Sequence, residues 1–464
     1  MIAALKPYPM MKDSGVPWLG DVPEHWEVGK LRTLLNRLTE RNRPDLPLLS
    51  VVREKGVIRR NITSSDDNYN FIPDDLSNYK VVRVGQFAMN KMKAWQGSYG
   101  ISQYDGIVSP AYFVFNLRGV DGVFFHSAIR SRAYVSFFTQ ASDGVRIGQW
   151  DLAQTRMNEI PFFVPLPDEQ AAIVRYLDYM DRRIRKYIRV KQKLIRLLEE
   201  QKQAIIHRAV TLGLDPNVRL KPSGVEWLGA VPEHWEVRRL RGILRRVTER
   251  NRPDLPLLSV VRERGVIVRD KNSQEENRNF IPDDLSNYKV VRVGQFAMNK
   301  MKAWQGSYGV SKYEGIVSPA YFVFNLSGVQ DRFFHSAIRS RAYVPSFTRA
   351  SDGVRIGQWD LSDARMREIV FVIPPFREQA AIVHHIDEST AFLHKALDRT
   401  NREISLLREY RTCLIADVVT GKLDVREAAA GLPDEDDEPE FIDETDEAAD
   451  NNADETTEEI ADAE

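Results

Sequence analysis

The chain has 464 residues, of which 43% are hydrophobic and 28% charged, and it contains one cysteine, Cys413. This composition is typical of a soluble protein of two to four domains, and a single cysteine excludes a disulfide framework and an all-cysteine metal site. Residues 1–11 lack a sustained apolar run and no longer apolar stretch follows, so we expect no signal peptide, no contact with a membrane and a cytoplasmic location.

The net charge of −1 hides an uneven distribution of charge along the chain. Residues 431–464 contain 17 of the 66 Asp and Glu residues and no Lys or Arg, so residues 1–430 hold 49 acidic and 65 basic residues, a net charge of +16. A basic body indicates a polyanionic partner, most often nucleic acid. The acidic segment predicts a disordered, solvated tail, which we favour over a tail that mimics DNA and competes for the basic body.

The first 164 residues predict a mixed α/β (α+β) globule, because short apolar runs alternate with turn signals. Trp18, Trp26 and Val28 should anchor an extended entry segment, in which His25 is a turn histidine rather than a ligand. The elements expected after it, in chain order, are a helix over Leu31–Leu38, a strand over Leu48–Val52, a polar loop over Arg59–Asn70, strands over Tyr79–Val84 and Gln86–Met89 around a turn at Gly85, a strand over Ile107–Leu117, a helix over Phe124–Val135, and a turn-rich segment over Ser142–Asp151.

At Pro165 the pattern changes to one long helix. Pro167, followed by two acidic residues, suits a first helical turn, while Gly213 with Pro216 beyond it suits an end near Val210. Ten positions from 173 to 205 alternate spacings of four and three, and eight of them suit the a and d positions of a coiled coil. At 1.5 Å per residue, such a helix would be ~60 Å long.

The whole arrangement occurs twice. Phe71–Gly100 returns unchanged as Phe280–Gly309, and this offset of 209 residues holds over almost the whole chain. Each unit is large enough to bury its own core. We therefore expect two tandemly duplicated α/β (mixed α+β) domains alternating with two long helices, which form an antiparallel intramolecular coiled coil around a pseudo-two-fold axis. The expected boundaries are 1–164 and 216–373 for the domains, 165–215 and 374–425 for the helices, and 426–464 for the acidic tail.

Catalytic motifs are missing from the sequence. There is no phosphate-binding GxxxxGK[ST] loop, no Asn/Asp-Pro-Pro-Tyr/Phe motif of an adenine methyltransferase, and no metal-site spacing of His, Cys and carboxylates. The nearest approach to a nuclease signature, Pro167-Asp168 with Glu200-Gln201-Lys202, falls on the predicted coiled coil and is not repeated in the second copy. We therefore expect a chain that catalyses nothing.

The order of motifs resembles the specificity subunit of type I restriction-modification systems. The motifs are the entry segments WLGDVPEHWEV and WLGAVPEHWEV and the helix starts PLPDEQAAIV and PPFREQAAIV, and the resemblance covers residues 14–425. It implies that each globular domain is a target-recognition domain reading one half of a bipartite sequence in double-stranded DNA. It also implies that the helices are a spacer that docks two methyltransferase (modification) subunits, and that restriction/translocase subunits join them. S-adenosylmethionine, ATP and Mg would then belong to those partners, with no cofactor in this chain.

The candidate DNA-binding residues lie in the repeated loop KMKAWQGSYG and among nearby arginines. The loop candidates are Lys91, Lys93, Trp95, Gln96 and Ser98, with counterparts Lys300, Lys302, Trp304, Gln305 and Ser307; the phosphate candidates are Arg130, Arg132 and Arg146, with counterparts Arg339, Arg341 and Arg355. The alternatives are a surface loop with one buried tryptophan and ordinary solvated or paired arginines. The candidate partner-binding residues are the coiled-coil positions Leu177, Ile184, Leu198, Ile386, Leu393 and Leu407.

Other functions stay open at this point. The chain could be the specificity protein of a methylation-only or other defence system, or a coiled-coil adaptor that does not bind DNA, whereas a single-chain restriction enzyme is disfavoured by the missing motifs. If the chain recognises DNA, the near-identity of its two domains predicts an interrupted, near-palindromic target.

Overall fold

The computed structural model describes residues 5–433 apart from 17–18, 54, 61–71, 74, 147–148, 263, 270–280, 283 and 356–357, and the side chains of 144–149 and 353–358 are also outside this description. The expected polar loop over Arg59–Asn70, apart from its first two residues, and the acidic segment from 434 onwards therefore lie outside the described residues. The chain divides into two compact units: unit 1 comprises Met1–Val190 with Glu403–Glu464, and unit 2 comprises Lys191–Arg402.

The domain of unit 1 is built on a four-stranded antiparallel sheet with the order β4-β11-β8-β9. Its strands are β4 (Leu35–Leu38), β8 (Phe87–Asn90), β9 (Tyr99–Ile101) and β11 (Tyr112–Leu117). The inner strand β8 is buried along its length, because helices α2 (Gly122–Ile129) and α3 (Arg132–Gln140) share its core. Phe87 of β8 meets Phe125 of α2 edge to face at 5.2 Å between ring centroids, a favourable aromatic geometry.

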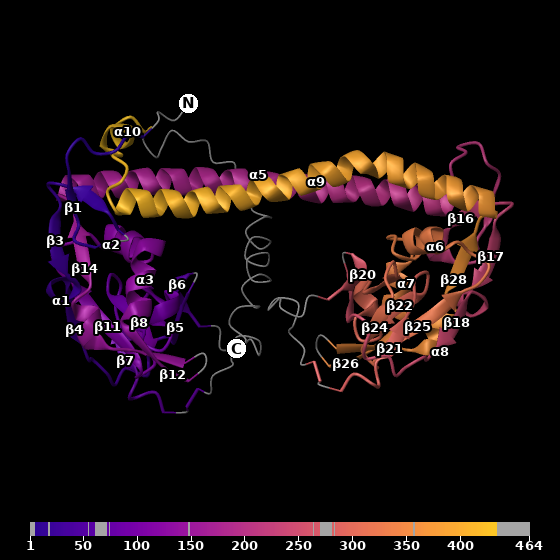
Figure 1. The fold of residues 1–464 in the computed structure, drawn as a ribbon, viewed down its shortest axis with the longest axis horizontal. Helices are drawn as coiled ribbons and strands as arrows, with labels where there is room; N and C mark the ends of the chain where they lie inside the picture. The colour runs from indigo at the N-terminus through magenta and orange to yellow at the C-terminus, as the bar shows by residue number, and fades with distance from the viewer. Residues whose placement is uncertain are drawn as a thin grey trace. The chain divides into compact units, whose positions relative to one another are not determined.

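Short antiparallel strand pairs surround this sheet (Figure 1). They are β1 (Met11–Asp13) with β2 (Asp21–Pro23), β3 (Glu27–Lys30) with β14 (Pro161–Val164), β5 (Leu49–Val52) with β6 (Gly56–Arg59), β7 (Lys80–Val82) with β10 (Gly106–Val108), and β12 (Ser142–Arg146) with β13 (Gln149–Leu152); the short helices are α1 (Leu31–Leu34) and α4 (Gln154–Asn158). The pair β3–β14 joins the beginning of the domain to its end, immediately before the long helix.

Unit 2 repeats the domain strand for strand. Its sheet has the order β18-β25-β22-β23, formed by β18 (Leu244–Val247), β22 (Phe296–Asn299), β23 (Tyr308–Val310) and β25 (Tyr321–Leu326). The other elements are β15 (Leu220–Pro222), β16 (Ala230–Pro232), β17 (Glu236–Arg239), β19 (Leu258–Val261), β20 (Gly265–Val268), β21 (Lys289–Val291), β24 (Gly315–Val317), α6 (Asp331–Ile338), α7 (Val344–Arg349), β26 (Ser351–Arg355), β27 (Gln358–Leu361), α8 (Asp363–Arg367) and β28 (Val370–Ile373). Helix α7 begins later than its counterpart α3 because Pro345 stands where α3 has Ser136, and proline is tolerated only in a first turn.

A long helix follows each domain in the chain: α5 (Pro167–Leu212) follows β14, and α9 (Phe376–Val419) follows β28. In unit 1 the early residues Ile173 and Leu177 of α5 share a core with the late residues Leu414 and Val418 of α9. In unit 2 the late residue Val210 of α5 and its neighbour Ala209 share a core with the early residues Ile382 and Ile386 of α9. Each helix start therefore lies against the end of the other helix, which confirms the expected antiparallel pair and the mixed α/β fold class.

A glycine follows the end of each long helix, and the one after the first helix, Gly213, was predicted. Gly213 and Gly421 each adopt φ of +75°, a left-handed conformation that costs glycine little. A short helix, α10 (Arg426–Ala430), follows α9 in a stretch that the sequence assigned to the tail. Among the described helices, none has an apolar stretch long enough to cross a membrane.

Two expected helices are shorter than predicted. Over Leu31–Leu38 the helix stops at Leu34, because Leu35–Leu38 pairs with β11 instead. The expected helix over Phe124–Val135 is two helices, since the chain breaks at Arg130 and Ser131 before α3 begins.

The expected strands exist but pair differently. The strand over Ile107–Leu117 is divided into β10 and β11 by a turn that includes Pro110, which has no N–H to donate to a ladder. The strands around Gly85 do not form a hairpin, because β7 pairs with β10 whereas β8 pairs with β9 and β11. The turn-rich segment Ser142–Asp151 lies within the β12–β13 hairpin.

Candidate nucleic-acid interface

The loop between β8 and β9 carries five predicted DNA-binding residues. Ala94–Gln96 forms a single 3₁₀ turn, and Trp95 packs on Trp150 of β13 with 5.5 Å between ring centroids. The Nζ of Lys91 lies 3.0 Å from Oδ1 of Asp151, the residue after Trp150 in β13. The loop and the β12–β13 hairpin therefore form one continuous surface in unit 1.

Unit 2 contains a geometric copy of this surface. Trp304 packs on Trp359 at 5.6 Å, and Lys300 pairs with Asp360 at 2.7 Å. The Nε1 of Trp304 is buried and finds no acceptor among the described residues, and the same holds for Trp95. Both surfaces thus have the same aromatic pair and the same lysine–aspartate pair.

The remaining loop residues differ in accessibility. Lys93 and Gln96 are half-buried, as is Gln305, while Lys302 is exposed, so all four lie at the surface. Ser98 is only 1% exposed, and Ser307 is buried in the same way. The predicted contact of the two serines with DNA therefore stays a prediction, for side chains that are covered in this structure.

Arg130, a predicted phosphate contact, donates hydrogen bonds to two backbone carbonyls of its own domain. Its Nη1 donates to the carbonyl of Tyr99 and its Nη2 to the carbonyl of Arg53, both at 2.6 Å. Arg339 does the same in unit 2, donating to the carbonyls of Tyr308 and Arg262. Because the guanidinium groups are committed to backbone carbonyls, these arginines fasten neighbouring strands together.

His126, one turn before Arg130 in α2, also bonds to the backbone of strand β9. The Nδ1 of His126 accepts a hydrogen bond from the backbone N–H of Ile101 at 3.0 Å. Burial, with a smaller contribution from Arg130, lowers the pKa of His126 to about 4, so the ring is neutral at pH 7 and Nδ1 stays an acceptor. His335 accepts from Val310 in unit 2, and burial likewise lowers its pKa to about 4.

The other predicted phosphate contacts have a simpler outcome. Arg132 and Arg341 are exposed at the beginning of α3 and just before α7. They remain candidates for contacts to a polyanion. The side chains of Arg146 and Arg355 lie outside the described residues.

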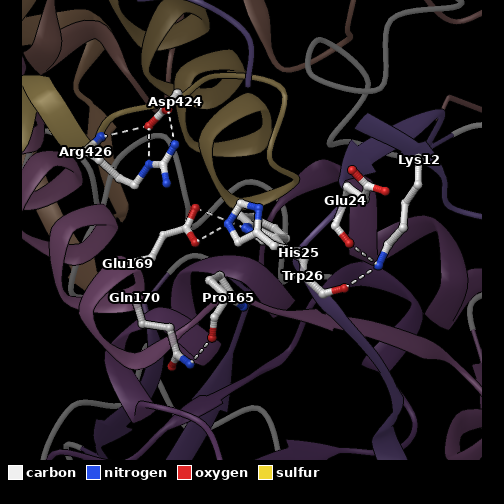
Figure 2. Close-up of polar contacts among 9 residues, drawn as sticks. All are labelled: Lys12, Glu24, His25, Trp26, Pro165, Glu169, Gln170, Asp424 and Arg426. Carbon is white, nitrogen blue, oxygen red and sulfur yellow. Dashed lines mark hydrogen bonds and ion pairs between the residues drawn. The ribbon is translucent and has the colours of Figure 1, made fainter. Parts of the chain in front are cut away.

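A buried polar joint links each domain to the start of its long helix, and sequence reasoning missed its role. Glu169, 4% exposed, accepts hydrogen bonds from Nε2 of His25 at 2.8 Å and from Nε1 of Trp26 at 3.0 Å (Figure 2). In unit 2, Glu378 accepts from His234 at 2.7 Å and from Trp235 at 3.0 Å. The signal was present, because the pairs His-Trp and Glu-Gln recur with the same 144-residue separation in both copies.

The neighbouring glutamine ties the same helix start to the domain. Gln170 donates to the carbonyl of Pro165 at 2.8 Å and accepts from the backbone N–H of Asp121 at 2.8 Å. Gln379 makes the equivalent pair of bonds, to Pro374 and from Gln330. The repeated Glu-Gln motif therefore fixes the helix to its domain.

The joint of unit 1 has additional partners from the end of the second helix. Asp424 holds Arg426 through two bonds of 3.0 and 2.6 Å, and the Arg426 guanidinium lies 5.0 Å from the ring of Tyr8 (Figure 2 shows the ion pair beside Glu169). The backbone of Asp424 also bridges Lys6. Residues after α9 thus close over the entry segment of unit 1.

Among the predicted partner-binding residues, Leu177 and Ile386 lie in cores to which both long helices contribute. Leu177, Ile184, Ile386 and Leu393 are buried, while Leu198 and Leu407 are half-buried. Other apolar residues of the helices are exposed instead: Tyr187, Val190, Leu406 and Tyr410 in unit 1, and Leu194, Leu197 and Phe392 in unit 2. Phe392 is 75% exposed, so any partner surface must be sought among this second set.

The part of the chain that the structure describes contains no cluster of three or more His, Cys, Asp or Glu residues that could hold a metal ion.

Comparison with known proteins identifies the fold. No family model and no curated protein matches the chain. A chain of a type I R-M system, solved in work on its complex assembly and conformational transition, aligns with a TM-score of 0.57 and 14% identity, covering 87% of this chain and 99% of that chain. The HsdS subunit from Thermoanaerobacter tengcongensis and the S subunit of a type I restriction-modification system from M. genitalium align at 14% and 13% identity, over 87% and 89% of this chain and 98% and 99% of theirs, with TM-scores of 0.40 and 0.33. The duplicated fold is thus shared with the first of these chains over almost its full length.

Proposed function

We propose that this chain is the DNA sequence-recognition (specificity) subunit of a type I restriction-modification complex. It binds a bipartite, interrupted target and directs adenine methylation and cleavage by partner subunits, while it catalyses neither reaction. The observation that carries the proposal is the alignment of its duplicated fold with 99% of a chain of a type I R-M system.

Each domain offers one set of residues for reading DNA. Lys93, Gln96 and Arg132 lie at the surface of unit 1 on two adjacent elements, and their counterparts Lys302, Gln305 and Arg341 do so in unit 2. Lysine and arginine supply the phosphate contacts that dominate affinity, and an amide side chain can pair bidentately with adenine in the major groove. Lys91 and Lys300 join this set if a phosphate replaces the aspartate that each now contacts.

The helix pair is proposed to dock two methyltransferase subunits. The exposed apolar side chains of its halves, with Phe392 the most exposed, supply the surface for such contacts. The partners bring S-adenosylmethionine for methylation, and restriction/translocase subunits bring ATP and Mg for translocation and cleavage.

DNA binding tests the proposal and separates it from its rivals. Full-length chain co-purified with methyltransferase subunits should bind duplex DNA with an affinity that falls steeply with salt, and each neutralised phosphate contributes ~0.9 to the slope. Replacing Arg132 and Arg341 by Gln should lower the slope by ~2, whereas the exposed Arg377→Gln on α9 should not change it.

The other outcomes assign the chain elsewhere. Retained methyltransferase binding with no DNA binding would overturn the proposal and favour an adaptor. Specific DNA binding and methylation without cleavage in the presence of all neighbouring gene products would assign a methylation-only system.

A further inference from the structure

A cavity of about 810 Å³ lies in unit 1 between the beginning of α2 and the first turns of α5. Val120, Val123 and Val174 give it an apolar wall, and Arg175 and Arg182 lie beside that wall. Val123 is exposed, although it sits next to the buried Phe124. The protein thus presents an apolar surface flanked by arginines that the described domain does not fill.

The last two described residues of the chain line this cavity. Leu432 and Pro433 belong to its lining, and Nη2 of Arg175 donates to their two carbonyls at 3.0 and 3.4 Å. The last described residues are therefore held at the cavity by an arginine, a side chain that also binds carboxylates.

The residues that follow have matching chemistry. Residues 434–464 contain 17 Asp and Glu, and Phe441 and Ile442 are the only large apolar residues before position 460. Phe441 is eight positions after Pro433, a reach of up to ~26 Å for an extended chain. The stretch of α5 from Pro167 to Arg182 is ~22 Å long, so the apolar pair can reach any part of the wall.

The part of α5 beside the cavity differs in charge from the equivalent part of α9. Residues 175–189 of α5 contain six Arg and Lys and two Asp, whereas the equivalent residues 384–398 of α9 contain one Lys and three acidic residues. An acidic segment is attracted to the first surface and repelled by the second.

The cavity wall also differs between the copies. Arg332 occupies the position of Val123 in unit 2 and pairs with Asp387 at 2.7 Å. Glu388 and His384 replace Tyr179 and Arg175. The two domains are otherwise nearly identical. The apolar and basic cavity lining therefore occurs in unit 1, the unit to which the acidic segment is attached.

We propose that residues 434–444 dock in this cavity of their own chain, with Phe441 and Ile442 against the valine wall and the flanking carboxylates on Arg175 and Arg182. A short tether gives a local concentration in the millimolar range, so even weak contacts keep the segment docked. Docking would neutralise the basic beginning of α5. The inference does not rest on DNA recognition, because every contact in it is intramolecular.

Disulfide trapping in the full-length chain tests the docking. In a Cys413→Ser background, Ile442→Cys is combined with Val123→Cys, or with Arg332→Cys at the matched position of unit 2. Under mild oxidation the pair with Val123→Cys should form an intramolecular disulfide at least ~10-fold faster, because trapping follows local concentration. Equal rates for the two pairs would overturn the proposal.

Charge reversal provides the second test. Arg175→Glu with Arg182→Glu should slow trapping at least ~10-fold, and 0.5 M salt should slow it in the unchanged protein because the Debye length falls to a few ångströms. The control pair Arg349→Glu with Arg377→Glu makes the same charge change at exposed positions of unit 2 and should leave the rate unchanged. A trapping rate that the Arg175→Glu, Arg182→Glu variant does not lower would overturn the proposal. A disulfide that links two chains instead of forming within one would overturn it as well.

Discussion

The polar joints at the two helix starts offer a test with an internal control, because the same residues occur in both units. Replacing Glu169 by Ala removes the acceptor of the Trp26 indole, and replacing Glu378 by Ala removes the acceptor of the Trp235 indole, each with a bond of 3.0 Å. Both carboxylates also accept from a histidine. The two substitutions are chemically identical and differ only in the environment of the carboxylate.

Burial sets the expected magnitudes. The Glu169 side chain is 4% exposed, so its loss leaves the Trp26 N–H unpaired in a dry site at a cost of ~1–3 kcal/mol. The lost bond to His25 adds roughly 0.5–1 kcal/mol, because that ring is 36% exposed and solvent weakens the pair. The Glu378 side chain is 25% exposed, so water can replace it. We expect about 2–4 kcal/mol for Glu169→Ala and about 1–2 kcal/mol for Glu378→Ala.

Hydrogen exchange can measure each joint separately, whereas a global unfolding curve of two units cannot. The opening free energies of the peptides over 20–30 and 229–239 should fall by these amounts in the respective variants. Glu169→Gln keeps a carbonyl acceptor for the indole and should cost less than Glu169→Ala. An equal loss in the two units, or a larger loss at Glu378, would refute the dependence on burial.

Three further predictions address pH, assembly and spacing. Because burial lowers the pKa of His126 and His335 to about 4, the unfolded chain takes up protons that the folded chain does not; stability is complete above pH ~6.5 and falls as the pH approaches 4, by up to on the order of 3 kcal/mol for each ring. His126→Asn keeps an acceptor for Ile101, so the pH dependence of the opening free energy measured by hydrogen exchange around Ile101 should flatten, and an unchanged pH dependence would contradict the assignment. Leu177→Asp with Ile184→Asp places charges in the buried helix seam and should abolish co-purification with methyltransferase subunits; unaltered co-purification would count against docking on the helix pair. Four residues inserted near the middle of either long helix lengthen it by ~6 Å and should widen the gap between half-sites by one or two base pairs, whereas an unchanged gap in the methylome would show that the helices do not set it.

The long helices were the most predictable part of the fold. Their seam repeats every seven residues, and their ends are determined locally, by Pro167 at one end and by Gly213 and Gly421 at the others. Such signals depend on neighbours within a turn, so the first helix, predicted to end near Val210, ends two residues later at Leu212. The duplication was equally certain, because an identical sequence in an identical context folds identically.

Strand pairing and side-chain roles were less predictable because they depend on contacts between distant residues. The strand over Leu35–Leu38 was expected as helix, and only its pairing with β11 makes it extended. Arg130 was predicted to contact phosphate because of its charge and its place in the sequence. Its guanidinium donates hydrogen bonds to the carbonyls of Arg53 and Tyr99, which lie 77 and 31 residues away in the chain. The acceptor of His25 lies 144 residues away, a separation that only the repeat itself could have revealed.

The likeness of the two proposed DNA-binding surfaces leads to a prediction about the target. Phe71–Gly100 is identical to Phe280–Gly309, and the Trp–Trp pairs agree to 0.1 Å, at 5.5 and 5.6 Å. Like domains that occupy the two inverted halves of a DNA site read like half-sites, so we expect a palindromic or nearly palindromic interrupted sequence, with half-sites centred ~10 base pairs apart. Asymmetry can enter only where the sequences of the copies differ, as at the exposed Gln103, whose counterpart in the second copy is Lys312, and in residues 59–70. A single bidentate contact discriminates by ~1–3 kcal/mol, enough to change one base of one half-site.

Mapping of methylated adenines decides how symmetric the target is. If Gln103 contacts a base, one position should differ between the half-sites, and Gln103→Lys should make them equal. If the difference persists in that variant, the loop at 59–70 is the reader, and exchanging Arg59–Thr63 for Val268–Asn272 should remove it. Two unrelated half-sites would refute the argument, because near-identical domains on one chain have no means of reading unrelated sequences.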